Sequence, residues 1–198
     1  MKGLIVLASA LLVLSSFGPK SEVQRMQYRV FLDGRAIGTY DVNRTDLNGS
    51  SHFRVETNMA VGLIRKSEHR FSLLSSFNDS KLLSSNLKTW VNQKLETSSD
   101  LRWNGEQYVK QDGENLTDIC TDLVSYSSAC VYFVEPVNRT SLFYEKYGKD
   151  LTLFKLEDHK YEVKLPNGTF ERYTYKDGLV SKVEFVQSFT TITLEAVN

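Results

Sequence analysis

Cysteine, proline and histidine are scarce in this sequence, which contains 2, 3 and 3 of them among 198 residues. Two cysteines cannot form a disulfide-rich scaffold, and the histidines, His52, His69 and His159, are too far apart for metal-ligand spacing. Neither sign of charge is in excess, with 24 basic and 24 acidic residues, and no basic stripe marks a nucleic-acid-binding surface. Phosphate loops, dinucleotide fingerprints and nucleophile elbows are also missing. The sequence therefore predicts no metal, no cofactor, no nucleic-acid partner and no catalytic residue, and favours a protein that is not an enzyme.

Long apolar runs are missing except for Leu4–Leu14 near the N-terminus. This run follows Lys2, is too short to span a bilayer, and precedes small residues, which is the pattern of a cleaved signal peptide over residues 1–18. An uncleaved anchor is the alternative. No lipobox cysteine follows the run, and no later segment is apolar enough to span a membrane. We expect an exported protein of the periplasm or extracellular space, with a short tail over 19–25 and a single β domain over 26–198.

Aromatic and turn-forming residues are abundant, with ten tyrosines and eleven phenylalanines. Turn signals recur roughly every eight to twelve residues and no long 3.6-residue period is present, which is typical of an all-β fold. Long strands with short loops favour one large curved antiparallel sheet, or a barrel or half-barrel. Gly38 inside a strand indicates a bulge or a close approach of two backbones. The strands expected in the first part are Met26–Leu32, Ala36–Asn43, His52–Val61, Ile64–Phe77, Leu82–Val91, Lys94–Trp103, Glu106–Gln111 and Glu114–Ile119.

The C-terminal stretch Lys160–Val197 is predicted to be a strand meander, preceded by a strand over Asp150–Leu156. Asn167-Gly168 and Asp177-Gly178 are the dipeptides preferred in two-residue hairpin turns, because both central residues need a positive φ. Two such turns place one set of side chains on a common face, with Arg172 as a charged misfit among them. The residues predicted to face the interior and any ligand are Tyr161, Val163, Leu165, Phe170, Val183 and Phe185.

One irregular segment, at about 119–148, interrupts the strand pattern, and we expect it to cover an open side or end of the sheet. Ser141–Tyr147 is predicted to be a short helix that Ser141 caps and Gly148 ends. Cys120 and Cys130 lie in this segment, and a disulfide between them is consistent with an oxidising compartment. Two separate buried thiols are the alternative. A carboxylate in the segment, Glu135, either serves a functional site or pairs with a basic side chain.

Six Asn-x-Ser/Thr sequons are present, and they are either glycan acceptors or turn residues beside strand-forming Ser and Thr. Because several fall at predicted turns, we favour the second interpretation. The six are Asn43, Asn48, Asn78, Asn115, Asn138 and Asn167.

Several blocks of turn and packing residues occur along the chain. They are Tyr28–Gly38, which contains a Gly-x-x-Ile-Gly pattern, Val131–Pro136, Tyr144–Gly148, His159–Tyr161, Leu165–Gly168 and Tyr173–Gly178. Together these blocks resemble a family of uncharacterised exported bacterial proteins, a domain of unknown function common in the Bacteroidetes, over about residues 24–197. The resemblance implies a wide, curved antiparallel half-barrel similar to periplasmic proteins of that shape, some of them suspected of holding lipid. It implies no catalytic activity, and the cysteine pair is not a feature of the family.

Three functional hypotheses follow from these patterns. The first is a non-catalytic binding or carrier protein for an apolar or lipid-like ligand held in the curved sheet. The second is a structural or interaction module whose sheet meets an envelope protein. The third is an enzyme with a cleft around Glu135, His159 and Arg172. The aromatic side chains fit either a ligand cavity or a filled core.

Overall fold

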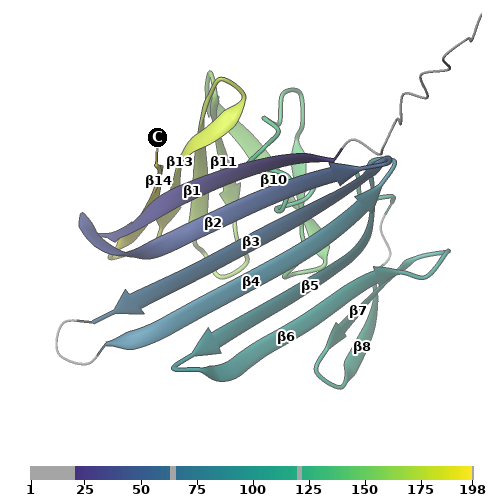
Figure 1. Cartoon of the computed structure of the whole chain (residues 1–198), viewed down its shortest axis with the longest axis horizontal. Helices are drawn as coiled ribbons and strands as arrows, with labels where there is room; N and C mark the ends of the chain where they lie inside the picture. The colour runs from purple at the N-terminus through teal and green to yellow at the C-terminus, as the bar shows by residue number, and fades with distance from the viewer. Residues whose placement is uncertain (1–20, 63–65, 120–121, 198) are drawn as a thin grey trace, which may run out of the picture.

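The protein is described by a computed structural model over residues 21–62, 66–119 and 122–197, and this part of the chain folds into one 14-stranded antiparallel sheet with no helix (Figure 1). The predicted all-β fold with a large curved sheet is therefore confirmed. The predicted signal peptide over 1–18 lies outside the described residues. In chain order the strands are β1 Glu22–Leu32, β2 Arg35–Leu47, β3 Ser50–Val61, β4 Ser67–Asn78, β5 Lys81–Val91, β6 Lys94–Trp103, β7 Tyr108–Asp112, β8 Asn115–Ile119, β9 Ser141–Tyr144, β10 Lys149–Glu157, β11 Lys160–Lys164, β12 Phe170–Lys176, β13 Leu179–Val186 and β14 Thr191–Ala196.

The sheet is a meander whose first and last strands pair with each other. The strand order is β8-β7-β6-β5-β4-β3-β2-β1-β14-β13-β12-β11-β10-β9. The two edges are therefore β8 and β9, which follow one another in sequence and do not pair. The sheet curves round like a barrel but remains open along this seam, so the half-barrel prediction holds and a closed barrel does not form.

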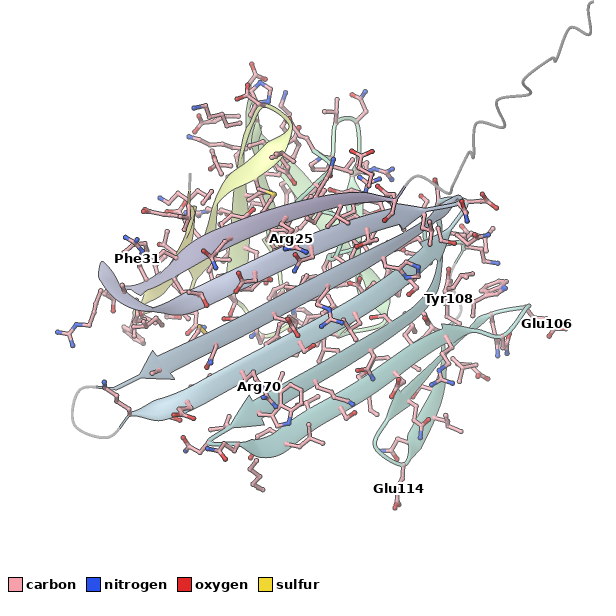
Figure 2. The ribbon with its side chains drawn as sticks, in the orientation of Figure 1. Arg25, Phe31, Arg70, Glu106, Tyr108 and Glu114 are labelled. Atoms are coloured by element: carbon pink, nitrogen blue, oxygen red, sulfur yellow. The ribbon has the colours of Figure 1, made fainter. Side chains whose placement is uncertain are left out.

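The long strands β1–β6 form the broad front wall in Figure 1. Buried side chains alternate with exposed side chains along them. In β3, for example, Phe53 and Val55 are buried whereas Arg54 is exposed. This period of two places the apolar residues on the concave face and leaves charged side chains such as Arg25 and Arg70 on the outer face (Figure 2). The apolar core accordingly lies inside the curve of the sheet.

Gly38 lies at a β-bulge and also at a close approach of two backbones, which are the two alternatives that a glycine inside a strand indicates. The pairing of β1 with β2 shifts between Val30 and Phe31, beside Gly38, which marks a β-bulge. A Cβ atom on Gly38 would also lie 2.1 Å from the backbone oxygen of Asn58 in β3. Only glycine therefore fits where β2 and β3 approach each other here.

The irregular segment runs through the interior of the sheet rather than only over its opening. We call residues 122–140 the inner segment. Its backbone is bound to distant strands, since Val124 O accepts from Leu82 N–H of β5 (2.8 Å) and Tyr132 O accepts from Val180 N–H of β13 (3.2 Å). The Tyr175 hydroxyl of β12 donates to Val131 O at 2.7 Å. The inner segment thus ties the two halves of the sheet together from within.

The helix predicted over Ser141–Tyr147 is wrong. Ser141–Tyr144 is instead strand β9, which pairs with the start of β10 in the register of Leu142 with Leu151. Only the turn after it is helix-like, because Gly148 N–H donates to Tyr144 O at 2.9 Å. Gly148 has a φ of 60°, so it ends this turn as it would have ended a helix. Pairing with β10 and burial of Leu142 outweighed the local capping signal.

The tail expected over 19–25 is shorter than predicted, and the connection between the second and third strands is short. Strand β1 begins at Glu22, and residues 22–25 pair with the C-terminal part of β2, as in the pair Val23 with Thr45. The turn between β2 and β3 is only Asn48-Gly49, both with positive φ. Polar residues lie on both faces of the sheet at this end of the strands, because Arg44 and Asp46 share the face of the buried Phe53.

The first turn of the C-terminal meander is longer than its sequence predicts. The Asn167-Gly168 dipeptide lies within a loop in which Leu165 N–H donates to Thr169 O at 2.8 Å and Gly168 N–H donates to Leu165 O at 2.9 Å. Lys164 consequently pairs with Phe170 and not with Glu171. The whole of β12 is displaced by one residue from the predicted register, and a one-residue slip exchanges the two faces of a strand.

The second turn has the predicted two-residue form, but a bulge follows it. Asp177 and Gly178 have φ values of 54° and 79°, and the register then shifts between Thr174 and Tyr175. Because of the bulge, the side chains of β13 point to the faces predicted for them, whereas those of β12 point to the opposite faces. Phe170, predicted to face inward, is therefore on the outer face beside Lys164.

Candidate binding cavity

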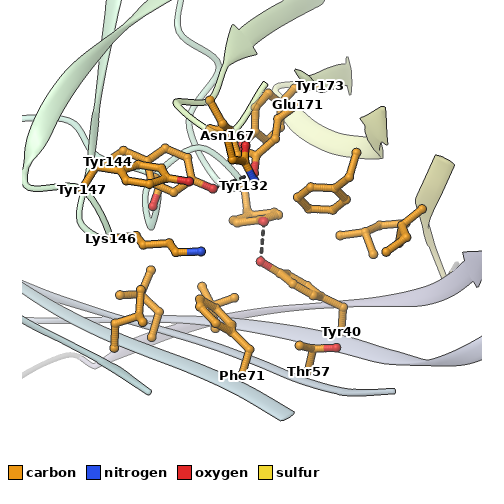
Figure 3. A pocket seen from close by; sticks show the side chains of 18 of the residues that line it. Tyr40, Thr57, Phe71, Tyr132, Tyr144, Lys146, Tyr147, Asn167, Glu171 and Tyr173 are labelled. Atoms are coloured by element: carbon orange, nitrogen blue, oxygen red, sulfur yellow. Dashed lines mark hydrogen bonds between the residues drawn. The ribbon is translucent and has the colours of Figure 1, made fainter. Parts of the chain in front are cut away.

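A cavity of about 250 Å³ lies on the concave side of the sheet, between β2–β5, the inner segment, the β9–β10 turn and β12–β14 (Figure 3). Most of its wall is apolar or aromatic, which is the usual character of a small-molecule site. Its volume is close to the lower end, about 300 Å³, of typical ligand pockets. The lining residues are Tyr40, Val55, Thr57, Met59, Phe71, Leu73, Leu87, Ser128, Tyr132, Tyr144, Lys146, Tyr147, Leu165, Asn167, Glu171, Tyr173, Phe185, Ile192 and Leu194.

A buried carboxylate, Glu171 of β12, forms the polar centre of this wall. The Tyr144 hydroxyl donates to its Oε1 at 2.6 Å, and the Tyr173 hydroxyl donates to its Oε2 at 2.5 Å. The side chain is only 2% exposed, so both of its oxygens are bound by neighbours and turned away from water. Another hydrogen bond, of 2.5 Å, joins the hydroxyls of Tyr40 in β2 and Tyr132 in the inner segment across the cavity (Figure 3).

Burial governs the titration of these groups. Desolvation raises the pKa of Glu171 above its ordinary value, although hydrogen bonds from Tyr144 and Tyr173 and the nearby charge of Lys146 act to lower it. Burial, together with the charge of Glu171, also raises the pKa of the Tyr144 and Tyr173 hydroxyls well above their ordinary value. The tyrosines therefore remain neutral hydrogen-bond donors, and Glu171 is the titrating group of the cavity.

We expect the stability of the protein to depend on pH through Glu171. A carboxyl whose pKa is higher in the folded than in the unfolded state stabilises the fold fully below the unfolded value, and this contribution is lost as pH rises through the folded value. Glu171→Gln removes the titration and keeps the shape. The free energy of unfolding of the variant should therefore rise relative to that of the wild type between pH 4 and pH 8, because only the wild type has to ionise a buried carboxyl.

Thermal or urea unfolding of both proteins across this pH range measures the effect. Glu157→Gln, at an exposed carboxylate outside the cavity, is the matched control. A difference between wild type and Glu171→Gln that is constant with pH would contradict the expected titration.

A second buried carboxylate, Glu145, anchors the inner segment beside the cavity. Its Oε1 accepts from the Ser127 hydroxyl at 2.6 Å and from the Ser75 hydroxyl of β4 at 3.2 Å. Its Oε2 accepts from the Ser128 hydroxyl at 2.5 Å and from Ser128 N–H at 3.2 Å. The Ala129 N–H donates to it as well, at 3.4 Å. Glu145 thus joins the β9–β10 turn, β4 and the inner segment through one carboxylate.

The residues predicted to face a ligand are only partly assembled at the cavity. Leu165 and Phe185 line it. Tyr161, Val163 and Val183 are buried in the core on the inner face but do not line it. Phe170 lies on the outer face, as the slipped register requires.

Sequence reasoning missed Glu171 and Lys146, which are the charged groups of the cavity. The signal for Glu171 was present in the alternation of Glu171, Tyr173 and Tyr175, all of which are buried. Arg172, the misfit of the predicted face, lies on the outer side, where its Nε donates to Glu162 at 2.7 Å. A charged misfit on a predicted apolar face was therefore evidence for a register error. Nothing in the local sequence marks Lys146.

The hypothetical catalytic cluster is not assembled as proposed. Glu135 and His159 do meet, with the His159 Nδ1 at 3.1 Å from the carboxylate, and the Tyr161 hydroxyl donates to Glu135 at 2.9 Å. Arg172 pairs with Glu162 on the opposite face of the sheet and takes no part. Glu135 therefore pairs with basic and hydroxyl groups, and His159 is largely exposed.

Cys130 is buried, and burial raises the pKa of its thiol to about 12, so as a thiol it is not a reactive thiolate at neutral pH. Cys120 lies outside the described residues, and the disulfide between them stays a prediction. Of the sequon residues, Asn48, Asn138 and Asn167 lie in turns. Asn43, Asn78 and Asn115 lie in strands.

The part of the chain that the structure describes contains no group of three or more His, Cys, Asp or Glu side chains placed to hold a metal ion. Within residues 21–62, 66–119 and 122–197, no helix has the length and apolar character needed to cross a membrane.

The open sheet, the inner segment and the internal cavity define an antiparallel protein of barrel-like shape with a small enclosed site. The family model described as "Domain of unknown function (DUF6134)" matches residues 28–197, and the chain belongs to this family. Among solved structures, the chain is similar to the crystal structure of a beta-barrel-like protein of domain of unknown function DUF1849 from Brucella abortus. That similarity has a TM-score of 0.48 and 12% sequence identity, and it covers 91% of this chain and 96% of the other. No curated protein matches this chain.

Proposed function

We propose that this protein is an exported, non-catalytic carrier that binds a small apolar or lipid-like ligand in the cavity. The observation that supports this most is the cavity itself, whose wall is mostly apolar or aromatic. Its wall includes Phe71, Leu87, Phe185 and Ile192 from four different strands. Burial of apolar ligand surface against such side chains contributes about 25 cal/mol per Å².

The proposal of export rests on the N-terminal apolar run Leu4–Leu14 and the small residues after it. The proposal of a non-catalytic role rests on the polar groups of the cavity. Glu171 is held by two tyrosine hydroxyls rather than by a base or a nucleophile. Carriage of a ligand through an aqueous compartment requires an apolar site that shields the ligand from water, and the largely apolar wall of the cavity supports this role.

The test is to fill the cavity by one substitution and to measure binding. Leu73→Trp places an indole in the cavity, whereas Leu74→Trp places the same side chain on the outer face of the same strand. We expect Leu73→Trp to weaken binding of the fluorescent apolar probe N-phenyl-1-naphthylamine at least about tenfold, since the space is occupied, and to cost about 1–3 kcal/mol of stability through overpacking. Leu74→Trp should bind as the wild type does.

Fluorescence titration measures the affinity, circular dichroism checks that both variants fold, and native mass spectrometry of protein purified from its own host identifies any ligand already bound. Probe binding that is equal in the wild type and Leu73→Trp would contradict binding at this cavity. A bare protein mass together with no probe binding by the wild type would contradict the carrier function.

One feature favours a second candidate, an interaction module for an envelope protein. Strand β8 is an edge of the sheet and pairs on one side only. It is exposed along most of its length, and Leu116 is 69% exposed. An unpaired edge with an exposed apolar side chain is a surface to which another strand can add. A protein that binds no apolar probe would shift the assignment to this candidate.

A further inference from the structure

The ammonium of Lys146 is the one cationic group that lines the cavity. Lys146 lies in the turn between β9 and β10, and its side chain extends into the cavity (Figure 3). Because the residue is also exposed to solvent, it marks the mouth of the cavity. Within the described part of the chain its ammonium forms no hydrogen bond and no ion pair within 4 Å, and it lies 5.6 Å from the ring centroid of Tyr147. It therefore has hydrogen-bonding capacity that a ligand could use.

The acidic group of the cavity is less accessible to a ligand. Each oxygen of Glu171 accepts a hydrogen bond from a tyrosine, and the carboxylate is almost completely buried. A cationic ligand head would have to reach a buried carboxylate that two tyrosines already hold, and it would also meet the charge of Lys146 at the entrance. An anionic head avoids both costs, because it finds an ammonium with free donors where the cavity meets water.

The rest of the wall is suited to a chain of methylene groups. Beyond Lys146 most of the lining is apolar or aromatic, with side chains from both halves of the sheet, among them Met59, Phe71 and Ile192. A volume of about 250 Å³ leaves room for one slender chain but not for a lipid with several. The mouth and the interior thus differ in polarity in the same sense as the two ends of an amphiphile.

We propose that the ligand is a single-chain amphiphile whose anionic head group binds the ammonium of Lys146 and whose tail lies in the apolar part of the cavity. This inference rests on the proposed carrier function and adds the class of ligand. Lys146 then acts as the specificity-determining residue, and the apolar wall supplies affinity that is insensitive to the head group.

Competition against the fluorescent probe, with purified protein, tests the head group directly. Decanoate is expected to bind at least about tenfold more tightly than 1-decanol, since a hydrogen-bonded ion pair at a partly desolvated site is worth that much or more. Lys146→Met should remove this preference and leave the affinity for 1-decanol unchanged. Lys149→Met, at an exposed lysine three positions away that does not line the cavity, should keep the full preference.

Acetate at the same concentration should not compete, because the head alone lacks the tail contacts. Competition by acetate equal to that by decanoate would overturn the amphiphile and indicate a simple anion site. Equal affinities for decanoate and 1-decanol, unchanged by Lys146→Met, would overturn the anionic head and leave the carrier function standing. Failure of the probe and both ten-carbon compounds to bind would overturn both proposals.

Discussion

Glu145→Leu is expected to lower the free energy of unfolding by about 3–4 kcal/mol, a large part of the 5–15 kcal/mol typical of a domain. The leucine would keep most of the volume but none of the acceptors. Hydroxyls of Ser75, Ser127 and Ser128 and two backbone N–H groups lose their partner, and each buried donor left unpaired costs about 1–3 kcal/mol. Some hydroxyls can turn to other acceptors, which is why the expected loss is smaller than the sum.

The same substitution should impair binding at the cavity, because Ser128 lines the cavity and is held in place by Glu145. Urea unfolding measures the stability, and probe titration measures the binding. Glu145→Gln, which keeps one acceptor, should lose less than Glu145→Leu in both experiments. Glu135→Gln is a control at another carboxylate that contacts the inner face but not this network. A free energy of unfolding for Glu145→Leu within about 1 kcal/mol of the wild-type value would contradict the role of Glu145 as an anchor.

Gly38→Ala is expected to be nearly as damaging, at about 3 kcal/mol or more, although it adds a single methyl group. The added carbon would lie 2.1 Å from the backbone oxygen of Asn58 and 2.8 Å from the Cα of Met59. Both neighbours are backbone atoms and cannot rotate away. Strands β2 and β3 would have to separate locally, and their hydrogen bonds around the pair Gly38 with Met59 would lengthen or break.

Thermal unfolding of Gly38→Ala beside Thr39→Ala measures this cost. Thr39 is the exposed neighbour on the same strand, so its substitution reports the ordinary effect of an alanine in β2, usually within about 0.5 kcal/mol. Equal melting temperatures for the two variants would show that the strands can part without penalty. Since Met59 also lines the cavity, Gly38→Ala should in addition weaken probe binding.

The fold was readable from the sequence because strand length and turn chemistry are local properties. Asp33-Gly34, Asn48-Gly49 and Asp177-Gly178 adopt the positive φ values that their residue types favour. The long strands between them alternate clearly enough to show an all-β sheet with one face buried. Pairing of β1 with β14 and the seam between β8 and β9 join residues far apart in sequence, so local signals carry no information about them.

The site was less readable because it depends on register. A longer loop at Asn167-Gly168 moved β12 by one residue and brought Glu171, in place of Phe170, to the inner face. The two predicted turns gave the same inner face for β12, but this agreement required both turns to be two-residue loops without a bulge. The role of Ser141–Tyr144 was hidden for a different reason, since its partner strand decides between helix and sheet when the local sequence permits either. Lys146 belongs to that misassigned segment.

The order of the strands also determines which parts of the chain open first. Chain ends are usually the least protected part of a domain, but here β1 and β14 lie in mid-sheet, and each is hydrogen-bonded on both sides. The free edges are β8 and β9, near the middle of the sequence. We therefore expect local unfolding to begin at these two strands and to reach β1 and β14 last. One of the two, β9, contributes Tyr144 to the wall of the cavity, so the strand that opens readily is also part of the binding site.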